Sequence, residues 1–341
     1  MKVSQQLGDI AVMIVITGGA GFIGSNMLAA LEARGFYELV VVDRLRSDNK
    51  WRNIAKRELA TILMPEQLFT FLDSHRTHIE LIVHMGAVSS TTEVDADKIL
   101  VNNFSLSLAL WEWCARNSVR LMYASSAATY GDGKAGFDDD FSSAHALARL
   151  RPLNIYGWSK HLFDRWVWRR LANGGARPPQ WVGLKFFNVY GPNEYHKGTQ
   201  ASVIVQIFSA IVRGRPCLLF RSQHPGYPDG GQMRDFIYVD DCIDVMLWLL
   251  DNPQISGLFN VGTGQARTFH DVALAIYQVL DREPCIQFID TPLAIRDQYQ
   301  YFTQAHMDRL RAVGYWKPFI GLEEGIRRYV GAYLMAAERY R

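Results

Sequence analysis

A tyrosine and a lysine spaced one helical turn apart carry the clearest catalytic pattern in this sequence. Tyr156 and Lys160 stand at i and i+4, which places both side chains on one face of a helix. A free tyrosine has a pKa of about 10, and a nearby ammonium lowers it by favouring the phenolate. Ser125 and Ser126 follow a predicted strand, where a hydroxyl can bind the reacting oxygen. The pattern predicts proton transfer, although the YxxxK spacing also occurs by chance and two serines can simply form a turn.

Three glycines predict a phosphate-binding turn. Gly18, Gly21 and Gly24 are spaced GxxGxxG, between the apolar run 10–16 and a predicted helix over 25–34. Glycine lets the backbone approach a pyrophosphate closely, and a helix N-terminus offers free N–H groups. A strand, this turn and a helix in succession are typical of dinucleotide binding. The alternative is a glycine-rich turn that serves packing alone.

The residues at the end of the next strand indicate which dinucleotide binds. A strand predicted over 39–42 is followed by Asp43, where a carboxylate can bind the adenosine ribose and favours NAD. Arg44, Arg46 and Lys50 come next, and such cations suit the additional 2′-phosphate of NADP. We therefore expect NADP, with NAD as the alternative cofactor and a solvated loop face as the alternative role of the cations.

The elements that position these residues alternate along the first half of the chain. Further strands are predicted over 81–84, 121–124 and 181–186, and helices over 66–76, 97–117 and 156–171. Such alternation predicts a parallel sheet with right-handed crossovers. After about residue 190 the pattern loosens, with helices predicted over 241–250, 268–281 and 322–338. The expected fold class is α/β: a Rossmann-like, doubly wound parallel sheet with a smaller C-terminal α/β lobe that binds substrate.

The 341 residues correspond to about two domains, at roughly 150 residues each. We expect an NADP-binding Rossmann domain over 11–190, to which 234–262 returns. The substrate-binding lobe would then comprise 191–233 and 263–341. We expect residues 1–12 to be an extension before a natural start at Met13, because the first strand needs little before it.

Composition excludes several other classes of protein. Lys and Arg total 36 and Asp and Glu 34, a net charge of +2, which offers no electrostatic basis for binding nucleic acid or a membrane surface. We see no signal peptide, and the run 10–16 is far shorter than the roughly 20 residues of a membrane span. Four well-separated cysteines lack metal-ligand spacing, so we expect no metal site and a cytoplasmic protein with reduced thiols. They are Cys114, Cys217, Cys242 and Cys285.

Several motifs give the sequence a family resemblance. Residues 18–24 (GGAGFIG), 125–126 (SS) and 156–160 (YGWSK) resemble the extended short-chain dehydrogenase/reductases, and 188–192 (NVYGP) and 234–236 (RDF) resemble their nucleotide-sugar branch. Within that branch the sequence resembles epimerases that act on ADP-linked heptoses. The motifs of this narrower resemblance are 89–93 (SSTTE), 124–131 (ASSAATYG), 152–157 (PLNIYG), 187–192 (FNVYGP), 196–198 (HKG), 201–203 (ASV) and 302–305 (FTQA). The resemblance extends from Met13 to about Tyr333.

The resemblance implies an isomerase with tightly held NADP that inverts C6″ of an ADP-heptose by transient oxidation. Its product would serve lipopolysaccharide core biosynthesis, and the protein would be a homo-oligomer, a pentamer by the resemblance. Tyr156 and Lys197 match two acid–base positions, Ser126 would bind the reacting oxygen, and Lys160 would hold the nicotinamide ribose. Without the resemblance, Lys197 would be interpreted as a surface lysine.

The resemblance also implies binding residues. Positions matching cofactor contacts are Phe22, Ile23, Asp43, Arg44, Lys50, Met85, Gly86, Ala87, Val88, Ser89, Asn102 and Val189. Positions matching substrate contacts are Asn188, Thr199, Gln206, Phe220, Arg221, Ser222, Gln223, Arg234 and Tyr299. Arg234 suits a diphosphate because a guanidinium binds phosphate oxygens bidentately. Its alternative role is an inter-lobe salt bridge to Asp240 or Asp241.

Departures from the family pattern leave the exact sugar open. Gln206 stands in place of a histidine, residues 220–223 (FRSQ) replace a Phe-Glu-Gly-Ser pattern, and the loop 222–232 is longer than expected. A UDP-hexose 4-epimerase is the alternative enzyme. A non-catalytic NADP sensor is the alternative of a different class, since fold alone does not give activity.

Overall fold

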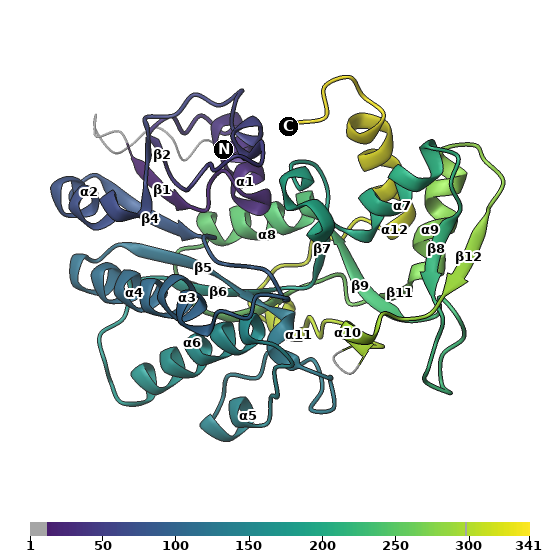
Figure 1. Cartoon of the computed structure of the whole chain (residues 1–341). Coiled ribbons are helices and arrows are strands. Elements are labelled where there is room, and N and C mark those ends of the chain that lie inside the picture. Colours follow the sequence, from purple (N-terminus) through teal and green to yellow (C-terminus); the bar gives the residue numbers. More distant parts are fainter. Residues whose placement is uncertain (1–11, 297–298) are drawn as a thin grey trace.

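The structure is a computed structural model that describes residues 12–296 and 299–341 (Figure 1). Residues 1–11 lie outside the described residues. They include nearly all of the predicted N-terminal extension and the start of the first predicted strand. No helix of the described chain is long and apolar enough to cross a membrane.

A seven-stranded sheet organises the first lobe. All of its neighbouring strands run parallel, in the order β10-β6-β5-β4-β1-β2-β3. Its strands are β1 (Met13–Thr17), β2 (Leu39–Val42), β3 (Thr61–Leu63), β4 (Ile79–His84), β5 (Arg120–Ser126), β6 (Trp181–Phe186) and β10 (Gly257–Val261). The order reverses between β1 and β4, as a doubly wound Rossmann-like sheet requires. The predicted α/β fold class is confirmed.

Helices cover both faces of this sheet (Figure 1). One face packs against α1 (Phe22–Ala33) and α8 (Val239–Asp251), and the other against α2 (Leu68–His75), α4 (Leu106–Asn117) and α6 (Ile155–Ala172). Within β1, Ile14 and Ile16 join the first of these two cores, while Val15 joins the second. Alternate strand residues point to opposite faces, so a strand covered on both sides is apolar throughout.

Short helical segments complete the first lobe. The α-helices are α3 (Ala96–Ile99) and α5 (Ala144–Ala148), and 3₁₀ turns occupy Lys50–Asn53, Pro65–Gln67 and Ala127–Tyr130; a further 3₁₀ turn, Tyr195–Gln200, belongs to the second lobe. A π-helical segment, Leu100–Ser105, joins α3 to α4. The continuous helix predicted over 97–117 therefore contains a wider turn in its first half.

The second lobe is smaller and has two short sheets. One is β11 (Ala266–Thr268), β9 (Met233–Tyr238) and β7 (Asn188–Tyr190), and the other is β12 (Ile286–Ile289) and β8 (Cys217–Phe220). Its helices are α7 (Val203–Val212), α9 (Phe269–Val279), α10 (Leu293–Arg296), α11 (Asp308–Ala312) and α12 (Leu322–Tyr329). A π-helical segment, Val330–Leu334, follows α12. The sequence patterns predicted α9 and α12 of this lobe, but neither α7 nor any of its strands.

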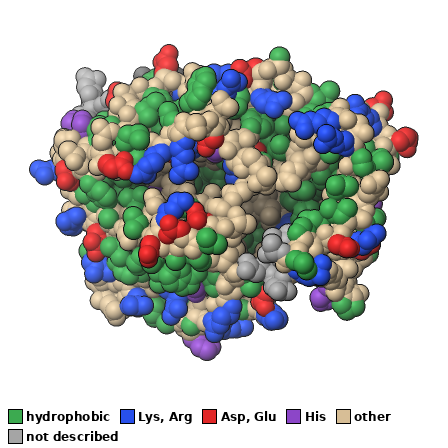
Figure 2. Space-filling model, in the orientation of Figure 1, with side chains coloured by type: hydrophobic (Ala, Val, Ile, Leu, Met, Phe, Trp, Pro, Cys, Tyr) green, Lys and Arg blue, Asp and Glu red, His purple; other side chains and the backbone are tan. Residues whose placement is uncertain are grey.

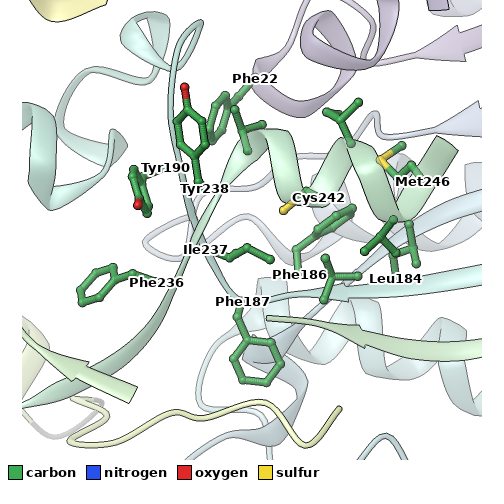
Figure 3. Close-up of a cluster of buried hydrophobic side chains, with 14 of the residues drawn as sticks. Phe22, Leu184, Phe186, Phe187, Tyr190, Phe236, Ile237, Tyr238, Cys242 and Met246 are labelled. Atoms are coloured by element: carbon green, nitrogen blue, oxygen red, sulfur yellow. The ribbon is translucent and has the colours of Figure 1, made fainter. Parts of the chain in front are cut away.

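An apolar core joins the two lobes (Figure 3). Phe186 and Phe187 follow each other across the end of β6, and Ile237 on β9 lies in the same cluster. Cys242 and Met246 contribute from α8. The carboxyl ends of the large sheet and the start of the second lobe are thus packed into one body.

Candidate active site

A pocket of about 680 Å³ lies between the two lobes, at the carboxyl ends of the central strands. Figure 2 shows this face of the molecule, which is hollowed near its centre. The predicted site residues that line the pocket are Gly18, Gly21, Phe22, Ile23, Gly24, Asp43, Lys50, Met85, Gly86, Ala87, Ser89, Ser126, Tyr156, Lys160, Asn188, Val189, Lys197 and Thr199. All four predicted catalytic residues are among them. Ligands of open α/β sheets bind at this edge, where the strand order reverses.

The glycine turn at the start of α1 forms a cradle with no room for side chains. A Cβ at position 24 would lie 2.3 Å from the Gly18 carbonyl oxygen, and one at position 18 would lie 2.6 Å from the Gly86 nitrogen. Gly21 caps α1 without a side-chain hydrogen bond, and the first turn contains no acidic residue. The helix therefore presents its free N–H groups and positive dipole end to the pocket. These residues fit the pyrophosphate of a dinucleotide.

The carboxylate at the end of β2 lies beside this cradle. Asp43 accepts a hydrogen bond from the Ala20 N–H at 3.0 Å and forms an ion pair with Lys50 at 2.6 Å. Arg44 pairs instead with Glu66 and is exposed. Arg46 adopts a left-handed backbone conformation with φ of 49° and does not line the pocket. Of the three predicted cations, the structure places only Lys50 in the pocket lining.

The loop after β4 is held by an asparagine that the sequence analysis did not single out. Asn103 accepts a hydrogen bond from the Val88 N–H at 2.8 Å and donates to the Val88 carbonyl at 3.0 Å and to Ser159 Oγ at 3.0 Å. Ser159 donates to the Tyr156 carbonyl at 2.7 Å. Asn103 thus fixes this pocket loop to the helix of Tyr156. The predicted Asn102 is half-buried and donates to the Lys98 carbonyl, away from the pocket lining.

Helix α6 brings Tyr156 and Lys160 to the pocket beside Ser126. Asn154 caps this helix by accepting a hydrogen bond from the Gly157 N–H at 2.8 Å, so the helix starts one residue before Tyr156. Burial raises the pKa of Tyr156, and a side-chain hydrogen bond with Ser126 acts in the opposite direction. Burial lowers the pKa of Lys160 to about 8. The protein's own side chains therefore hold Tyr156 as a neutral phenol, unlike the lowered pKa that the spacing suggested, because desolvation of the phenol dominates.

Lys197 approaches the pocket from the other lobe. It lies in the 3₁₀ turn Tyr195–Gln200, half-buried, with its ammonium 5.4 Å from the centre of the Phe22 ring. Burial lowers its pKa, and Glu194 acts in the opposite direction. Lys197 is therefore a lysine of the pocket lining, next to the first residue of α1.

Arg234 and Tyr299 lie together in the second lobe, beyond the pocket lining. The Arg234 guanidinium is 5.4 Å from the Tyr299 ring and 5.5 Å from the ring of Phe269, which lines the pocket. Tyr299 also contacts Phe220, with ring centres 5.9 Å apart. Arg234 is 8% exposed and forms no salt bridge within the described residues. Burial of this unpaired cation lowers its pKa.

The alternative salt bridge of Arg234 is not formed. Asp240 pairs with Arg341 at 2.5 Å, and Asp241 accepts a hydrogen bond from the Ile320 N–H at 2.8 Å. Arg234 is thus a buried guanidinium beside the pocket that donates to the Met233 carbonyl at 2.8 Å and has no carboxylate partner among the described residues.

The remaining predicted substrate residues make contacts within the second lobe. Gln206 donates to the Ala201 carbonyl at 3.0 Å, and Arg221 pairs with Asp290 at 3.3 Å. Ser222 donates to the His224 carbonyl, and the Gln223 N–H donates to the Tyr301 hydroxyl. None of the four lines the pocket, so a role in binding substrate stays a prediction for them.

Sequence reasoning gave no role to two residues near Lys197. His196 lines the pocket, and its Nδ1 lies 3.1 Å from Asn53 Nδ2. Gln200 also lines the pocket and donates to Ser90 Oγ at 2.6 Å. The turn that carries Lys197 is therefore attached to the first lobe on both sides. Only the HKG motif pointed to this turn, and single polar residues in a loop give no pattern that would predict such contacts.

Comparison with known proteins places this fold and site in a class. Residues 14–262 match the model of the NAD dependent epimerase/dehydratase family, and the chain belongs to this family. The predicted resemblance is confirmed, and membership indicates a nicotinamide cofactor.

Individual relatives have names that specify one enzyme within this family. A protein of Nitratidesulfovibrio vulgaris (strain DP4) named ADP-L-glycero-D-manno-heptose-6-epimerase is 48% identical over 333 residues, which cover 96% of this chain and all of that protein. A Fusobacterium nucleatum protein of the same name is 43% identical over 96% of this chain and 100% of its own length. The crystal structure of the Helicobacter pylori ADP-L-glycero-D-manno-heptose-6-epimerase superimposes with a TM-score of 0.75 at 28% identity, covering 95% of this chain and 96% of that one. The Thermus thermophilus UDP-glucose 4-epimerase in complex with NAD gives 0.71 at 26% identity, covering 96% and 100%.

Proposed function

We propose that this protein is an isomerase that interconverts ADP-D-glycero-D-manno-heptose and ADP-L-glycero-D-manno-heptose at C6″. The observation that carries the proposal is one pocket that unites a phosphate-binding turn with Tyr156, Lys160, Ser126 and Lys197. Full-length relatives with this name support the choice of substrate. The product serves lipopolysaccharide core biosynthesis, in the cytoplasm, where the four free cysteines stay reduced.

The two lobes supply binding groups for the dinucleotide and for the sugar nucleotide. Gly18, Gly21 and the start of α1 hold the pyrophosphate of the dinucleotide, and Lys160 holds its nicotinamide ribose. When bound, the nicotinamide accepts a hydride from carbon and returns it. Arg234 binds the diphosphate of the sugar nucleotide, because a buried guanidinium without a carboxylate partner is stabilised by an anion.

The protein's own task at C6″ is to move a proton. Ser126 donates a hydrogen bond to the C6″ oxygen. Tyr156 exchanges the hydroxyl proton with that oxygen as the C–O bond gains and loses double-bond character. Inversion requires the hydride to return to the opposite face of the transient carbonyl, which changes where its oxygen lies, and Lys197 is the second acid–base group, for that position. Burial lowers the pKa of Lys197 below its usual value, the direction that favours proton exchange by a lysine.

For the cofactor, we propose NADP held tightly in each subunit. Lys50 lines the pocket beside Asp43, where it would meet a ribose 2′-phosphate. Release of the bound nucleotide by denaturation, followed by chromatography, distinguishes NADP from NAD. We also propose a homo-oligomer, a pentamer by family resemblance, which light scattering on the purified protein measures directly.

The substrate is tested by incubating the protein with ADP-D-glycero-D-manno-heptose without added cofactor and separating the two epimers. Conversion toward an equilibrium mixture is expected. The alternative, a UDP-hexose 4-epimerase, is favoured by the similar fold of the Thermus enzyme. Interconversion of UDP-glucose and UDP-galactose without conversion of the ADP-heptose would establish that alternative instead. Nucleotide binding with neither activity would indicate a sensor.

A further inference from the structure

A buried carboxylate closes the segment that carries Lys197. Glu194 is 0% exposed, and both of its oxygens accept hydrogen bonds from neutral donors. Oε1 accepts from the Gly191 N–H at 3.2 Å and from Ser202 Oγ at 2.7 Å, and Oε2 accepts from the Ser202 N–H at 2.5 Å. One side chain thus joins both ends of the segment 191–202, which has Lys197 near its middle.

The backbone between these two ends is irregular. The 3₁₀ turn Tyr195–Gln200 is interrupted at Gly198, the residue after Lys197, where φ is 56° and ψ is −121°. Hydrogen bonds in 3₁₀ turns also have poorer geometry than those of an α-helix. Ser202 stands in the N-cap position of α7, but its side chain does not cap this helix and donates to Glu194 instead. Since a serine in this position usually caps the helix, its hydroxyl stabilises the segment rather than the start of α7.

The first residues of the segment are attached to the first lobe. Asn193 is 0% exposed and has a left-handed backbone with φ of 73°, and its Nδ2 donates to Ser25 Oγ at 3.0 Å. Asn26 Nδ2 donates to the Pro192 carbonyl at 3.0 Å. Ser25 and Asn26 both lie on α1, the helix that follows the glycine turn. Glu194 therefore connects a point that is fixed to α1 with the far end of the segment.

We propose that Glu194 is a positioning residue that keeps Lys197 at the pocket by joining the two ends of the segment 191–202. The inference rests on the proposed function, in which Lys197 is the second acid–base group. Glu194 is not among the residues that line the pocket, so it acts through the backbone of the segment and not on the substrate. Because a displacement of about 1 Å can cost about 10²-fold in rate, holding the segment in place supports kcat.

Two variants test the carboxylate and its donor separately. Glu194→Gln keeps the shape of the side chain but replaces one acceptor oxygen with an NH₂ group, which cannot accept a hydrogen bond. Ser202→Ala removes the hydroxyl donor and keeps the negative charge of Glu194, so it separates the loss of the connection from the loss of the charge. Asp241→Asn is the matched control, because Asp241 is a buried carboxylate outside the segment that accepts a hydrogen bond from the Ile320 N–H at 2.8 Å.

The first measurement is the rate at which acetic anhydride acetylates Lys197, followed by mass spectrometry with the exposed Lys134 as the internal reference. In Ser202→Ala we expect the relative rate to rise about fivefold, the factor that corresponds to one ordinary hydrogen bond in a local opening equilibrium. Glu194→Gln should raise it further, and Asp241→Asn should leave it unchanged. An unchanged rate in the folded variants would overturn the proposal. So would a rise confined to Glu194→Gln, which would indicate an effect of charge alone.

The second measurement is the steady-state kinetics of the proposed epimerisation. In Glu194→Gln, kcat should fall about 10- to 100-fold. This factor should exceed the rise in KM, because Lys197 exchanges a proton and does not hold the diphosphate. A raised KM with an unchanged kcat would overturn the proposal. Ser202→Ala, the milder change, decides if Glu194→Gln does not fold. Acetylation needs no substrate, so a failure of the proposed epimerase activity is seen separately, as an inactive wild-type protein.

Discussion

In the protein alone Tyr156 is a neutral phenol, because its burial raises the pKa. The positive charges of Lys160 and of a bound nicotinamide would favour the phenolate, the form that takes up the C6″ hydroxyl proton. Replacing it with phenylalanine removes the proton-transfer group but keeps the ring. For Tyr156→Phe we expect kcat to fall about 10²- to 10⁴-fold, the usual contribution of general acid–base catalysis. Epimer separation by chromatography measures the loss. The content of bound nucleotide should stay at the wild-type level, and a variant that keeps full activity would exclude Tyr156 as the acid–base group.

Arg234 is predicted to act in binding rather than in proton transfer. Arg234→Lys keeps a positive charge but loses the planar fork that binds a diphosphate bidentately. We expect KM for the sugar nucleotide to rise about 10- to 100-fold, since a hydrogen bond to a charged group contributes roughly 1.5–3 kcal/mol. Steady-state kinetics measure this change. Arg34→Lys is the control, because Arg34 is exposed and pairs with Asp251; equal effects in the two variants would argue against substrate contact.

Some residues of the site could be predicted from the sequence and others could not. The motifs led to Tyr156, Lys160 and Lys197, and the structure brings all three to one pocket. They gave no role to Asn103, or to His196 within the HKG motif, because the partners of both residues are distant in sequence. A role for such residues follows only from the tertiary contacts.

At the scale of elements, the turn between β1 and α1 is predicted to tolerate no side chain. Gly24→Ala would place a Cβ 2.3 Å from the Gly18 carbonyl oxygen, so the backbone of the turn must shift. We expect a loss of about 1–3 kcal/mol in the free energy of unfolding, typical of overpacking, together with loss of bound nucleotide. Denaturant unfolding and nucleotide release measure the two effects. Gly331→Ala, where the Cβ meets open space, should change neither.

Two strands of the large sheet, β3 and β10, were not predicted. The other five were predictable because both faces of the sheet are buried. Their apolar runs are continuous, and 39–42 and 181–186 match β2 and β6 to the residue. The strands β7, β8, β11 and β12 have only three or four residues each. Segments this short have no clear period, and their pairing depends on partners far away in the sequence. The same difference explains why the pocket lining of the first lobe was predicted more completely than the cluster around Arg234.

For the whole molecule, buried histidines predict a loss of stability in acid. Burial lowers the pKa of His84 to about 3, and those of His161 and His196 to about 4. Between these values and about 6.5 the unfolded chain binds more protons than the folded one, so the free energy of unfolding rises with pH in that window. Asp139 and Asp241, each with a pKa raised to about 6, act in the opposite direction but with smaller shifts.

Urea unfolding at pH 5 and pH 7 tests this expectation. The wild-type protein should be less stable at pH 5. In His84→Gln, which does not titrate, the difference between the two pH values should be smaller. An equal pH dependence in the wild type and the variant would show that His84 does not contribute.

The central claim is that C6″ is oxidised and reduced again within one pocket. The most direct test is to run the epimerisation of ADP-D-glycero-D-manno-heptose in deuterium oxide without added cofactor and to locate deuterium in both epimers by NMR. The account predicts conversion with ordinary hydrogen retained at C6″, because a hydride held by the enzyme does not exchange with solvent. Deuterium at C6″ would show that a proton is removed from carbon to solvent, and would contradict the proposed mechanism.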